Sequence, residues 1–443
     1  MEKIYLNSLL LFSFFSCLSV CNENIPETWN YLIIFSFLLI SIVRFFVKRK
    51  IVNDFFFKIL IFCFFLPLFL SIIVSFFNVN LLSENKDYVN YFFKDSLGRK
   101  INILVFFLIF IGINSIIKNN NKYMLKKILK SYVLGVTIFI SIVGLWQVLN
   151  KYFNIPIPFE LNSRTHIHSA GTVASFLKIR LTGLANEPSY AAPYLIDVII
   201  LSYLFRYKKL FIFNLFILLL TYSGGGYIDL LFLFMLIFFH KGLARRKIKV
   251  FIIILSIFFI LSLISSNYSK FFELFSPVLN RFSSEHDLFS IKYNIRSYMV
   301  IMPFVWIFLE KGFFPYFFGM GTGSFKYLSN TKFFYDGRSV HITSNNLFSD
   351  FVYECGYIGL VLLIIMFVLL FKRLEKNFKK NKNIYNKVNL ILFFHLIVSS
   401  LYRADFLSSR FFLIISFIKI LELLGKNIKI NDKEKIKNNE AKI

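Results

Sequence analysis

Acidic residues and cysteines are scarce in this chain of 443 residues. It contains 24 Asp and Glu against 51 Lys and Arg, and only 4 Cys. The cysteines lie in or beside long apolar runs, with no spacing typical of a metal site and no pair placed across a polar loop. This pattern argues against a disulfide framework and a cysteine-ligated metal centre. We interpret all four thiols as packing residues of predicted helices: Cys17, Cys21, Cys63 and Cys355.

Signatures of nucleotide-dependent proteins are missing as well. No phosphate-binding P-loop is present. Gly319, Gly321 and Gly323 do not match a dinucleotide fingerprint, because no strand is predicted before them and the next glycine is missing. We find no internal repeat or matched pair of interrupted apolar segments, which many transporters have. ATP-driven transport is therefore not expected, and no cofactor is predicted.

Apolar residues, by contrast, are abundant. The chain is 57% hydrophobic and 20% aromatic, with 61 Phe and a mean hydropathy of +0.65, whereas a soluble domain is about 45–50% apolar. Apolar runs of about 14 to 24 residues alternate with short pieces rich in Lys and Asn, which is typical of membrane-spanning helices. We predict an all-α polytopic membrane protein with about twelve transmembrane helices, at residues 5–21, 29–43, 55–77, 101–117, 132–149, 189–205, 210–222, 227–240, 250–266, 346–371, 388–402 and 411–424.

The net charge of +27 is distributed unevenly between alternate loops. With the N-terminus inside, the cytoplasmic pieces hold 31 Lys and Arg in about 77 residues, and the opposite pieces hold 18 in about 160. By the positive-inside rule, both termini are predicted to be cytoplasmic and residues 267–345 to form a large periplasmic loop. The charge therefore indicates topology and contact with the lipid bilayer, with no nucleic acid as partner. Residues 1–424 are predicted to form a single transmembrane domain, and 425–443 a disordered cytoplasmic tail.

Three apolar stretches need separate interpretation. No cleavage site follows the first one, so we expect it to be retained as an anchor. Residues 210–240 are predicted to be two short helices, because Ser223-Gly224-Gly225-Gly226 interrupts them and a single helix would put the flanking basic clusters on opposite faces. The stretch 298–309 is too short to span, so we predict a re-entrant or interfacial helix.

Candidate functional residues lie at the outer ends of the predicted helices and in the long outer loops. Arg180 and Glu187 precede a helix predicted to start at Ser189, and a helix N-terminus attracts anions; a simple Arg–Glu ion pair is the alternative. Arg281 and Arg296 lie in the large loop. Arginine forms planar, bidentate contacts with phosphate, although solvated loop charges would look the same.

A third group lies around the helix predicted to begin near Asn346. His341 precedes this helix, and Asp350 and Glu354 stand four residues apart on one of its faces. Ionisable groups inside a membrane usually face a polar cavity. The remaining histidines considered are interpreted as surface or packing residues: His166, His168, His286 and His395.

In their order and spacing, these motifs resemble those of the O-antigen polymerase and ligase family. The resemblance covers about residues 180–360. It consists of Arg180, Gly183, Glu187-Pro188-Ser189, Thr221-Tyr222-Ser223-Gly224-Gly225-Gly226, Ser290, Arg296, Gly319-x-Gly321-x-Gly323-x-Phe325, His341, Asn346 and Glu354-x-Gly356-x-x-Gly359. The helix count and the large loop extend the resemblance to the whole chain and imply a GT-C-like fold.

The resemblance implies glycosyl transfer at the outer face of the bacterial cytoplasmic (inner) membrane. A growing glycan would leave undecaprenyl diphosphate and join a hydroxyl of the next lipid-linked repeat unit. The implied partners are the undecaprenyl-diphosphate-linked glycan, a chain-length regulator and a flippase.

Roles for individual residues follow from the same resemblance. Arginines would stabilise the departing pyrophosphate without a metal ion: Arg180, Arg281 and Arg296. His341 or Glu187 would take the proton of the acceptor hydroxyl. The supporting residues of the site would be Asn346, Asp350 and Glu354.

Three other functions stay open at this point. One is a ligase of the same family, which would transfer the finished polymer to the lipid A core. Another is a polysaccharide flippase, a transporter class with a similar helix count but no need for a large outer loop. The last is a membrane interaction protein without catalysis.

Overall fold

The structure is a computed structural model. It describes residues 2–21, 34–35, 37–39, 42, 54–81, 96–119, 122–156, 180–239, 295–309, 313–324, 334–335, 338–339, 344, 346–403 and 407–426.

Nearly all of these residues are helical. The N-terminal half contains α1 (Glu2–Phe15) with a 3-10 turn (Ser16–Val20), α3 (Phe55–Leu60), α4 (Leu66–Leu81), α6 (Leu97–Asn119), α7 (Lys122–Val136) and α8 (Val143–Phe153). Single π-helical segments, Ile61–Phe65 and Thr137–Ile142, join α3 to α4 and α7 to α8. The remaining helices are α10 (Pro188–Phe205), α11 (Lys208–Leu220), α12 (Gly224–Phe239), α15 (Ile295–Leu309), α16 (Phe313–Phe318), α18 (Leu347–Lys380), α19 (Ile384–Tyr402) and α20 (Ser409–Lys426). Between them, β1 (Phe334–Tyr335) pairs antiparallel with β2 (Arg338–Ser339).

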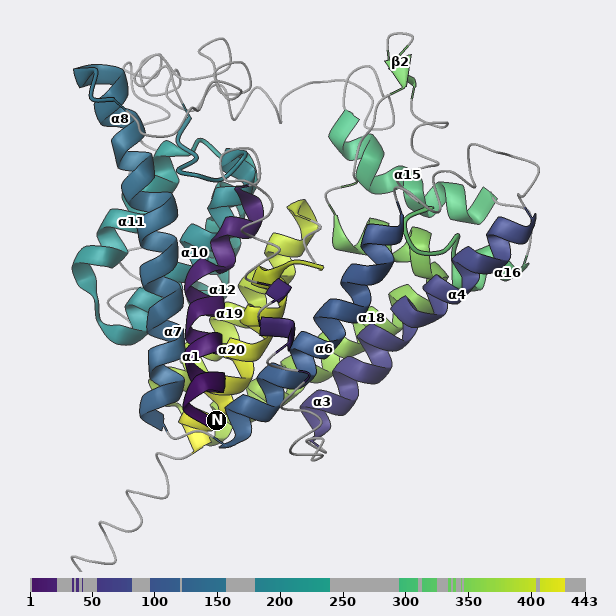
Figure 1. The fold of residues 1–443 in the computed structure, drawn as a ribbon, viewed down its shortest axis with the longest axis horizontal. Coiled ribbons are helices and arrows are strands. Elements are labelled where there is room, and N and C mark those ends of the chain that lie inside the picture. The colour runs from purple at the N-terminus through teal and green to yellow at the C-terminus, as the bar shows by residue number, and fades with distance from the viewer. Residues whose placement is uncertain are drawn as a thin grey trace, which may run out of the picture.

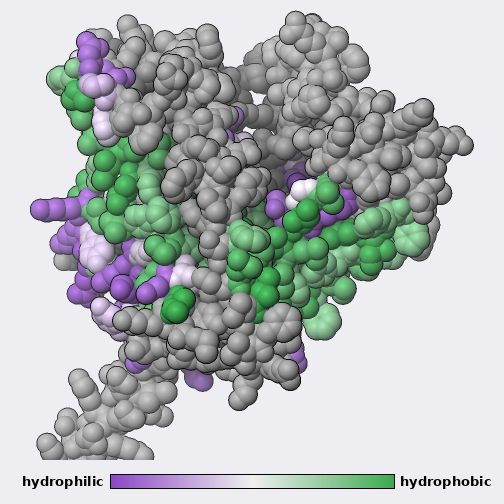
Figure 2. Space-filling view, in the orientation of Figure 1, coloured by the Kyte–Doolittle hydropathy of each residue, from purple (hydrophilic) through white to green (hydrophobic). Residues whose placement is uncertain are grey.

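Six helical segments are long and apolar enough to cross a membrane. They are Phe55–Phe77, Leu97–Ser115, Lys122–Asn150, Pro188–Phe205, Leu347–Lys380 and Ile384–Tyr402. Large apolar side chains remain exposed on them, as expected where lipid is the solvent, and Figure 2 shows a broad hydrophobic surface over the tilted helices on the right. The predicted all-α membrane class is therefore confirmed.

The predicted count of twelve spans is not reached among the described residues. Four further predicted spans, 5–21, 210–222, 227–240 and 411–424, are helical but shorter or more charged than the six. The predicted span 250–266 and most of 29–43 lie outside the described residues. The large loop 267–345 is described only in part. Twelve spans and that loop therefore stay predictions.

The predicted interruption of residues 210–240 is present, but two to three residues earlier than predicted. Helix α11 ends at Leu220, and α12 begins at Gly224. The glycines form the first turn of α12, where Gly225 packs against the ring of Tyr402 and Gly226 against Ala192. Close packing, not a need for an unusual turn, accounts for these glycines. The short stretch near 298–309 is α15, a helix of 15 residues.

Helices α19 and α20 form the centre of the bundle. In Figure 1 they lie between a group containing α1, α7, α8 and α10–α12 and a tilted group containing α3, α4, α6 and α18. Helix α19 contacts α10, α12, α18 and α20, and α20 also contacts α6 and α7. Helix α20 buries residues on every side, which is the pattern of a central helix. Its charged residues must therefore be paired inside the protein.

The chain enters and leaves the bundle at two opposite ends. We call the upper end the one where α8 ends and α10 begins, and the lower end the one that holds the N-terminus (Figure 1). Both α15 and β2 lie at the upper end, as does the C-terminus of α8 (Figure 1). Which membrane side the upper end faces stays a prediction.

Candidate functional site

The N-terminus of α18 starts where the sequence predicted. The Asn346 side chain caps it, accepting hydrogen bonds from the backbone N–H groups of Phe348 and Ser349 at 2.9 and 3.1 Å. Asparagine is among the best N-cap residues, because its short side chain satisfies otherwise unpaired N–H groups. Its amide also donates to the carbonyl of Leu401 at 2.8 Å. Asn346 thus ties the start of α18 to the end of α19.

Helix α18 is broken at Gly356, two residues after Glu354. Gly356 has φ 70° and ψ −176°, a conformation that a residue with a Cβ rarely adopts. A Cβ there would collide with the carbonyl oxygen of Phe317, at the end of α16. The break lets the chain at the end of α16 approach the α18 backbone directly.

The loop that follows α16 seals this break. Met320 N–H donates to the carbonyl of Tyr353 at 2.9 Å, and Gly321 N–H donates to that of Glu354 at 3.1 Å. Those carbonyls lose their helical partners at the break, so the loop satisfies them. Gly319, Gly321 and Gly323 all have positive φ, between 81° and 90°. These glycines therefore form a tight loop, and its purpose is to cap a broken helix.

Two carboxylates lie directly above the break and share an arginine. Glu354 Oε2 accepts from Arg99 Nε at 3.0 Å, and Asp350 Oδ2 lies 4.0 Å from Arg99 Nη2. Both carboxylates are almost fully buried, whereas the Arg99 side chain is 31% exposed. Ser344 donates a short hydrogen bond to Asp350. The predicted shared face of Asp350 and Glu354 is present, and α6 supplies its counter-charge.

Sequence reasoning did not select Arg99. Its available signal was weak: an arginine in the first turn of an apolar helix, followed by Lys100. Lys100 is itself buried, and its ammonium donates to Ser96 Oγ at 2.5 Å. Two cations and two carboxylates therefore lie together where α6 and α18 meet.

Arg180 and Glu187 have partners that the sequence did not predict. Arg180 donates through Nε to the carbonyl of Thr221 at 3.3 Å and through Nη2 to that of Tyr222 at 3.0 Å. Cations are favoured at such carbonyls, which end α11. Glu187 is the N-cap residue of α10 and accepts from Ser189 Oγ at 2.9 Å. The helix thus begins at Pro188, one residue before the predicted start.

The end of α19 brings these separate segments together. Leu401 accepts from Asn346, the start of α18. Tyr402 donates to Asp229 of α12 at 3.1 Å. The guanidinium of Arg403 stacks over the ring of Tyr190, three residues after Glu187. Sequence segments near 187, 229, 346 and 401 therefore meet at the upper end of the bundle.

Three predicted residues cannot be placed in this site. His341 and Arg281 lie outside the described residues. Arg296 is the second residue of α15, but its side chain lies outside the described part. Their predicted roles stay predictions.

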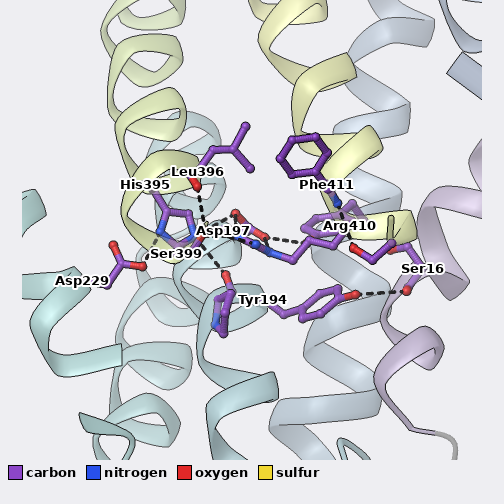
Figure 3. A network of polar contacts seen from close by, with 12 residues as sticks. Ser16, Tyr194, Asp197, Asp229, His395, Leu396, Ser399, Arg410 and Phe411 are labelled. Carbon is purple, nitrogen blue, oxygen red and sulfur yellow. Dashed lines mark hydrogen bonds and ion pairs between the residues drawn. The ribbon is translucent and has the colours of Figure 1, made fainter. Parts of the chain in front are cut away.

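A second polar centre lies deeper in the bundle and was missed by sequence reasoning. His395 of α19 bridges two carboxylates, with Nδ1 2.8 Å from Asp229 Oδ2 and Nε2 3.1 Å from Asp197 Oδ1. Arg410 of α20 binds the other side of Asp197, with Nε 2.7 Å from Oδ2. Tyr132 of α7 donates to that same oxygen at 2.7 Å. Figure 3 shows Asp197 between His395 and Arg410, with Asp229 beyond the imidazole ring.

This network joins four long helices and α12 at a point sealed from solvent. Asp197, Asp229, His395 and Arg410 each have 0% exposure. Charges buried in a low-dielectric interior are tolerated when they are paired and hydrogen-bonded. His395 is not a surface residue, because its ring is fully buried and carboxylate oxygens lie within 3.1 Å of both ring nitrogens. The residues stand too far apart in sequence for any local pattern to reveal them.

A third charged cluster lies at the lower end. Glu422 of α20 accepts from Arg373 Nη2 at 2.7 Å and from Lys426 Nζ at 2.6 Å. Lys419 pairs with Asp54, the N-cap of α3. These contacts tie α3, α18 and α20 together. Within the described part of the chain, no three His, Cys, Asp or Glu side chains converge in a way that could hold a metal ion.

Comparison with known proteins adds no assignment. No model of a known protein family matches this chain, and no curated protein matches it significantly. The function is therefore inferred from the motifs and from the geometry of the site.

Proposed function

We propose that this protein polymerises undecaprenyl-diphosphate-linked oligosaccharide repeat units into a surface polysaccharide, at the outer face of the bacterial cytoplasmic membrane. One observation carries the proposal: the motif segments around Glu187, Asn346 and Glu354 lie at the same end of a membrane-spanning bundle, although they are far apart in sequence. A reaction between two lipid-linked substrates needs its polar groups gathered at one membrane surface.

The proposed glycosyl transfer uses only side chains of this protein. The acceptor hydroxyl oxygen attacks the anomeric carbon of the donor sugar, and the bond from that carbon to the diphosphate oxygen breaks. A base takes the hydroxyl proton, and cations stabilise the negative charge that develops on the diphosphate. Direct attack inverts the anomeric configuration.

Five residues keep the roles given by the family resemblance. Arg180, Arg281 and Arg296 bind the leaving diphosphate. His341 is the preferred base, with Glu187 as the alternative. Glu187 already holds a structural position as N-cap of α10, bonded to Ser189, which favours a positioning role for it.

Arg99 is an additional candidate for contact with the substrate. Its side chain is 31% exposed, while Glu354 and Asp350 lie against Nε and Nη2 of its guanidinium. The guanidinium of arginine is a planar set of donors that matches a phosphate. Asp350 and Glu354 then act as positioning residues. Asn346 positions the same helix through its cap.

The lipid part of the substrate fits the exterior of the same helices. Exposed apolar side chains run along α4, α6 and α18, the helices that carry the Arg99 cluster: Leu70, Ile73, Phe76, Phe77, Leu97, Ile101, Leu104, Ile358, Val361 and Ile365. A polyprenyl chain can lie against this surface while its diphosphate reaches the polar end.

The test is polymerisation by the purified chain in lipid nanodiscs. Synthetic undecaprenyl-diphosphate repeat units are supplied, and the length of lipid-linked glycan is measured by electrophoresis or mass spectrometry. A ladder of products supports the proposal. His341→Ala is expected to reduce turnover by roughly 10²–10⁴-fold, whereas Glu187→Gln is expected to reduce it less. Unchanged monomeric substrate, with folded protein and a verified substrate, contradicts the proposal.

A deletion strain separates the related functions. Loss of a polymerase leaves single repeat units on the acceptor. Loss of a ligase leaves polymer on the lipid carrier and the acceptor unmodified. The strain's surface glycan therefore distinguishes the two family activities.

A flippase is the second candidate, and the network around His395 favours it. Ionisable residues buried between membrane helices often mark pathways for ions or protons. A flippase deletion traps lipid-linked repeat units inside the cell. If the protein is a flippase, the purified protein in vesicles should move a labelled lipid-linked unit between leaflets without lengthening its glycan.

A further inference from the structure

Three lysines at the lower end of the bundle lie over aromatic rings. Lys130 Nζ is 5.4 Å from the ring centre of Phe205 and 5.7 Å from that of Tyr207. Lys387 Nζ is 5.2 Å from the ring centre of Tyr203 and donates to its hydroxyl at 3.1 Å.

The third lysine repeats the arrangement, with Lys126 Nζ 5.7 Å from the ring centre of Tyr385. We call these seven residues the lower basic–aromatic patch: Lys126, Lys130, Tyr203, Phe205, Tyr207, Tyr385 and Lys387.

The patch is built from three helix ends. Lys126 and Lys130 lie in the second and third turns of α7, Tyr203 and Phe205 in the last turn of α10, and Tyr385 and Lys387 in the first turn of α19. Helix α10 contacts both α7 and α19. Figure 2 shows hydrophilic residues gathered at the lower left of the molecule, below the hydrophobic surface.

The charge of the patch is of one sign. Residues 122–136, 203–213 and 381–389 contain no Asp or Glu. Other cations at the lower end have acidic partners: Lys379 pairs with Glu375, and Arg373 pairs with Glu422. The lysines of the patch have rings beneath them instead. The exposed turn between α10 and α11 adds Arg206, Lys208 and Lys209.

The rings and the adjacent helices have the character expected at the depth of lipid headgroups. Tyr203 and Tyr207 are 40% and 37% exposed, and tyrosine is typical of the membrane–water interface. Immediately beyond Tyr207, α11 exposes Ile212 and Phe216, at 66% and 51%. Leu134, one turn above Lys130, is 55% exposed. An acyl chain can therefore lie along these apolar side chains while its headgroup meets the lysines.

We propose that the lower basic–aromatic patch is a binding site for the headgroup of an anionic phospholipid. The phosphodiester lies among Lys126, Lys130 and Lys387, and the acyl chains lie against α7 and α11. The rings restrict the conformations of the lysine side chains at the interface. Less conformational entropy is therefore lost when the headgroup binds. Apolar surface lies directly beside the cations, and this favours a lipid over a soluble anion as the ligand. This proposal is independent of the enzymatic one.

The test compares two variants of equal charge. One is Lys126→Gln/Lys130→Gln/Lys387→Gln. The control is Lys372→Gln/Lys376→Gln/Lys380→Gln, which removes three exposed lysines from the end of α18. The full-length protein in detergent is titrated with equal amounts of phosphatidylglycerol and phosphatidylcholine, and the bound lipids are counted by native mass spectrometry.

The patch variant is expected to lose the preference for phosphatidylglycerol. Each lysine near an anionic headgroup contributes about a fivefold change in affinity, so the triple variant should bind it roughly a hundredfold more weakly. The control should keep wild-type affinity. Equal loss in both variants would mean that only net charge matters and would overturn the site.

Two further measurements keep the result decisive. Soluble glycerol phosphate should compete poorly, because it lacks acyl chains; effective competition would mean a soluble-anion site instead. If the triple variant does not yield monodisperse protein, Lys387→Gln alone is measured. A single variant with unchanged phosphatidylglycerol affinity would contradict the proposal.

Discussion

His395 Nδ1 lies 2.8 Å from Oδ2 of Asp229, in the interior of a bundle whose surface is apolar. This contact joins α19 to α12, and the other nitrogen of the same ring joins α19 to Asp197 of α10. Arg410 then extends the network to the central helix α20. The end of α19, which carries Tyr402 and Arg403, is therefore held in place by charged residues two helical turns deeper in the bundle.

The network predicts a large effect of removing one charge. Arg410→Met should destabilise the protein by about 3–5 kcal/mol, because Asp197 is left buried without its main cation. Ser399→Ala removes only a neutral partner of Arg410 and should cost about 1 kcal/mol. Thermal unfolding of each variant in detergent measures both losses of stability. Adding Asp197→Asn to Arg410→Met should recover part of the loss; no recovery would mean that the charge pair is not the cause.

The helix break predicts a strict requirement for glycine at 356. Gly356→Ala should give little folded protein, because its positive φ and the carbonyl of Phe317 leave no place for a Cβ. Gly98→Ala is the matched control at the same end of the bundle, since nothing lies within 4 Å of its Cβ position. Size-exclusion profiles of the two variants make the comparison. Monodisperse, wild-type-like Gly356→Ala protein would contradict the described break.

Variants of Arg99 and Glu354 should separate an effect on stability from an effect on activity. Arg99→Gln should reduce the amount of folded protein, because it strands the buried carboxylate of Glu354. The double variant Arg99→Gln/Glu354→Gln should fold better, since both charges are removed. If Arg99 binds the diphosphate, the double variant stays inactive in polymerisation while its melting temperature recovers. Recovery of both would make Arg99 a purely structural residue.

The diphosphate-binding arginines predict sensitivity to a conservative change. Arg180→Lys, Arg281→Lys and Arg296→Lys keep the charge but lose the planar fork, so at least two should impair polymerisation at normal protein levels. Near-normal product ladders from all three would mean that these arginines are not ligands. Arg180→Lys should in addition weaken the cap at Thr221 and Tyr222, so its melting temperature is measured alongside activity.

The topology makes a prediction for intact cells. Single cysteines introduced into residues 267–345 of a Cys-free variant should react with a membrane-impermeant reagent, because that segment is predicted to be outside. Cysteines introduced into 372–387 should react only after permeabilisation. The native cysteines at 17, 21, 63 and 355 are buried, so their replacement by Ala or Ser is the starting point. Labelling with the opposite pattern would reverse the orientation.

Sequence alone was sufficient to predict the six helices that are long and apolar enough to cross a membrane. The start of α18 at Asn346, the interruption before α12 and the shared face of Asp350 and Glu354 were all predicted correctly. Each depends on interactions within a few residues of the chain: capping, proline and glycine geometry, and helical periodicity. Exact bounds were less accurate. The interruption came before the glycines, because packing against Tyr402 decided their place in α12.

The sequence by itself determined that lipid surrounds this protein and that its fold is helical. The reason is that the length of an apolar run and the alternation of basic loops are properties of consecutive residues. Only the tertiary structure decided which polar side chains meet. Arg99 reaches Glu354, and Arg410 reaches Asp197, across more than 200 residues of sequence. Such pairs form where helices pack against one another, and buried charges persist only where that packing supplies a partner.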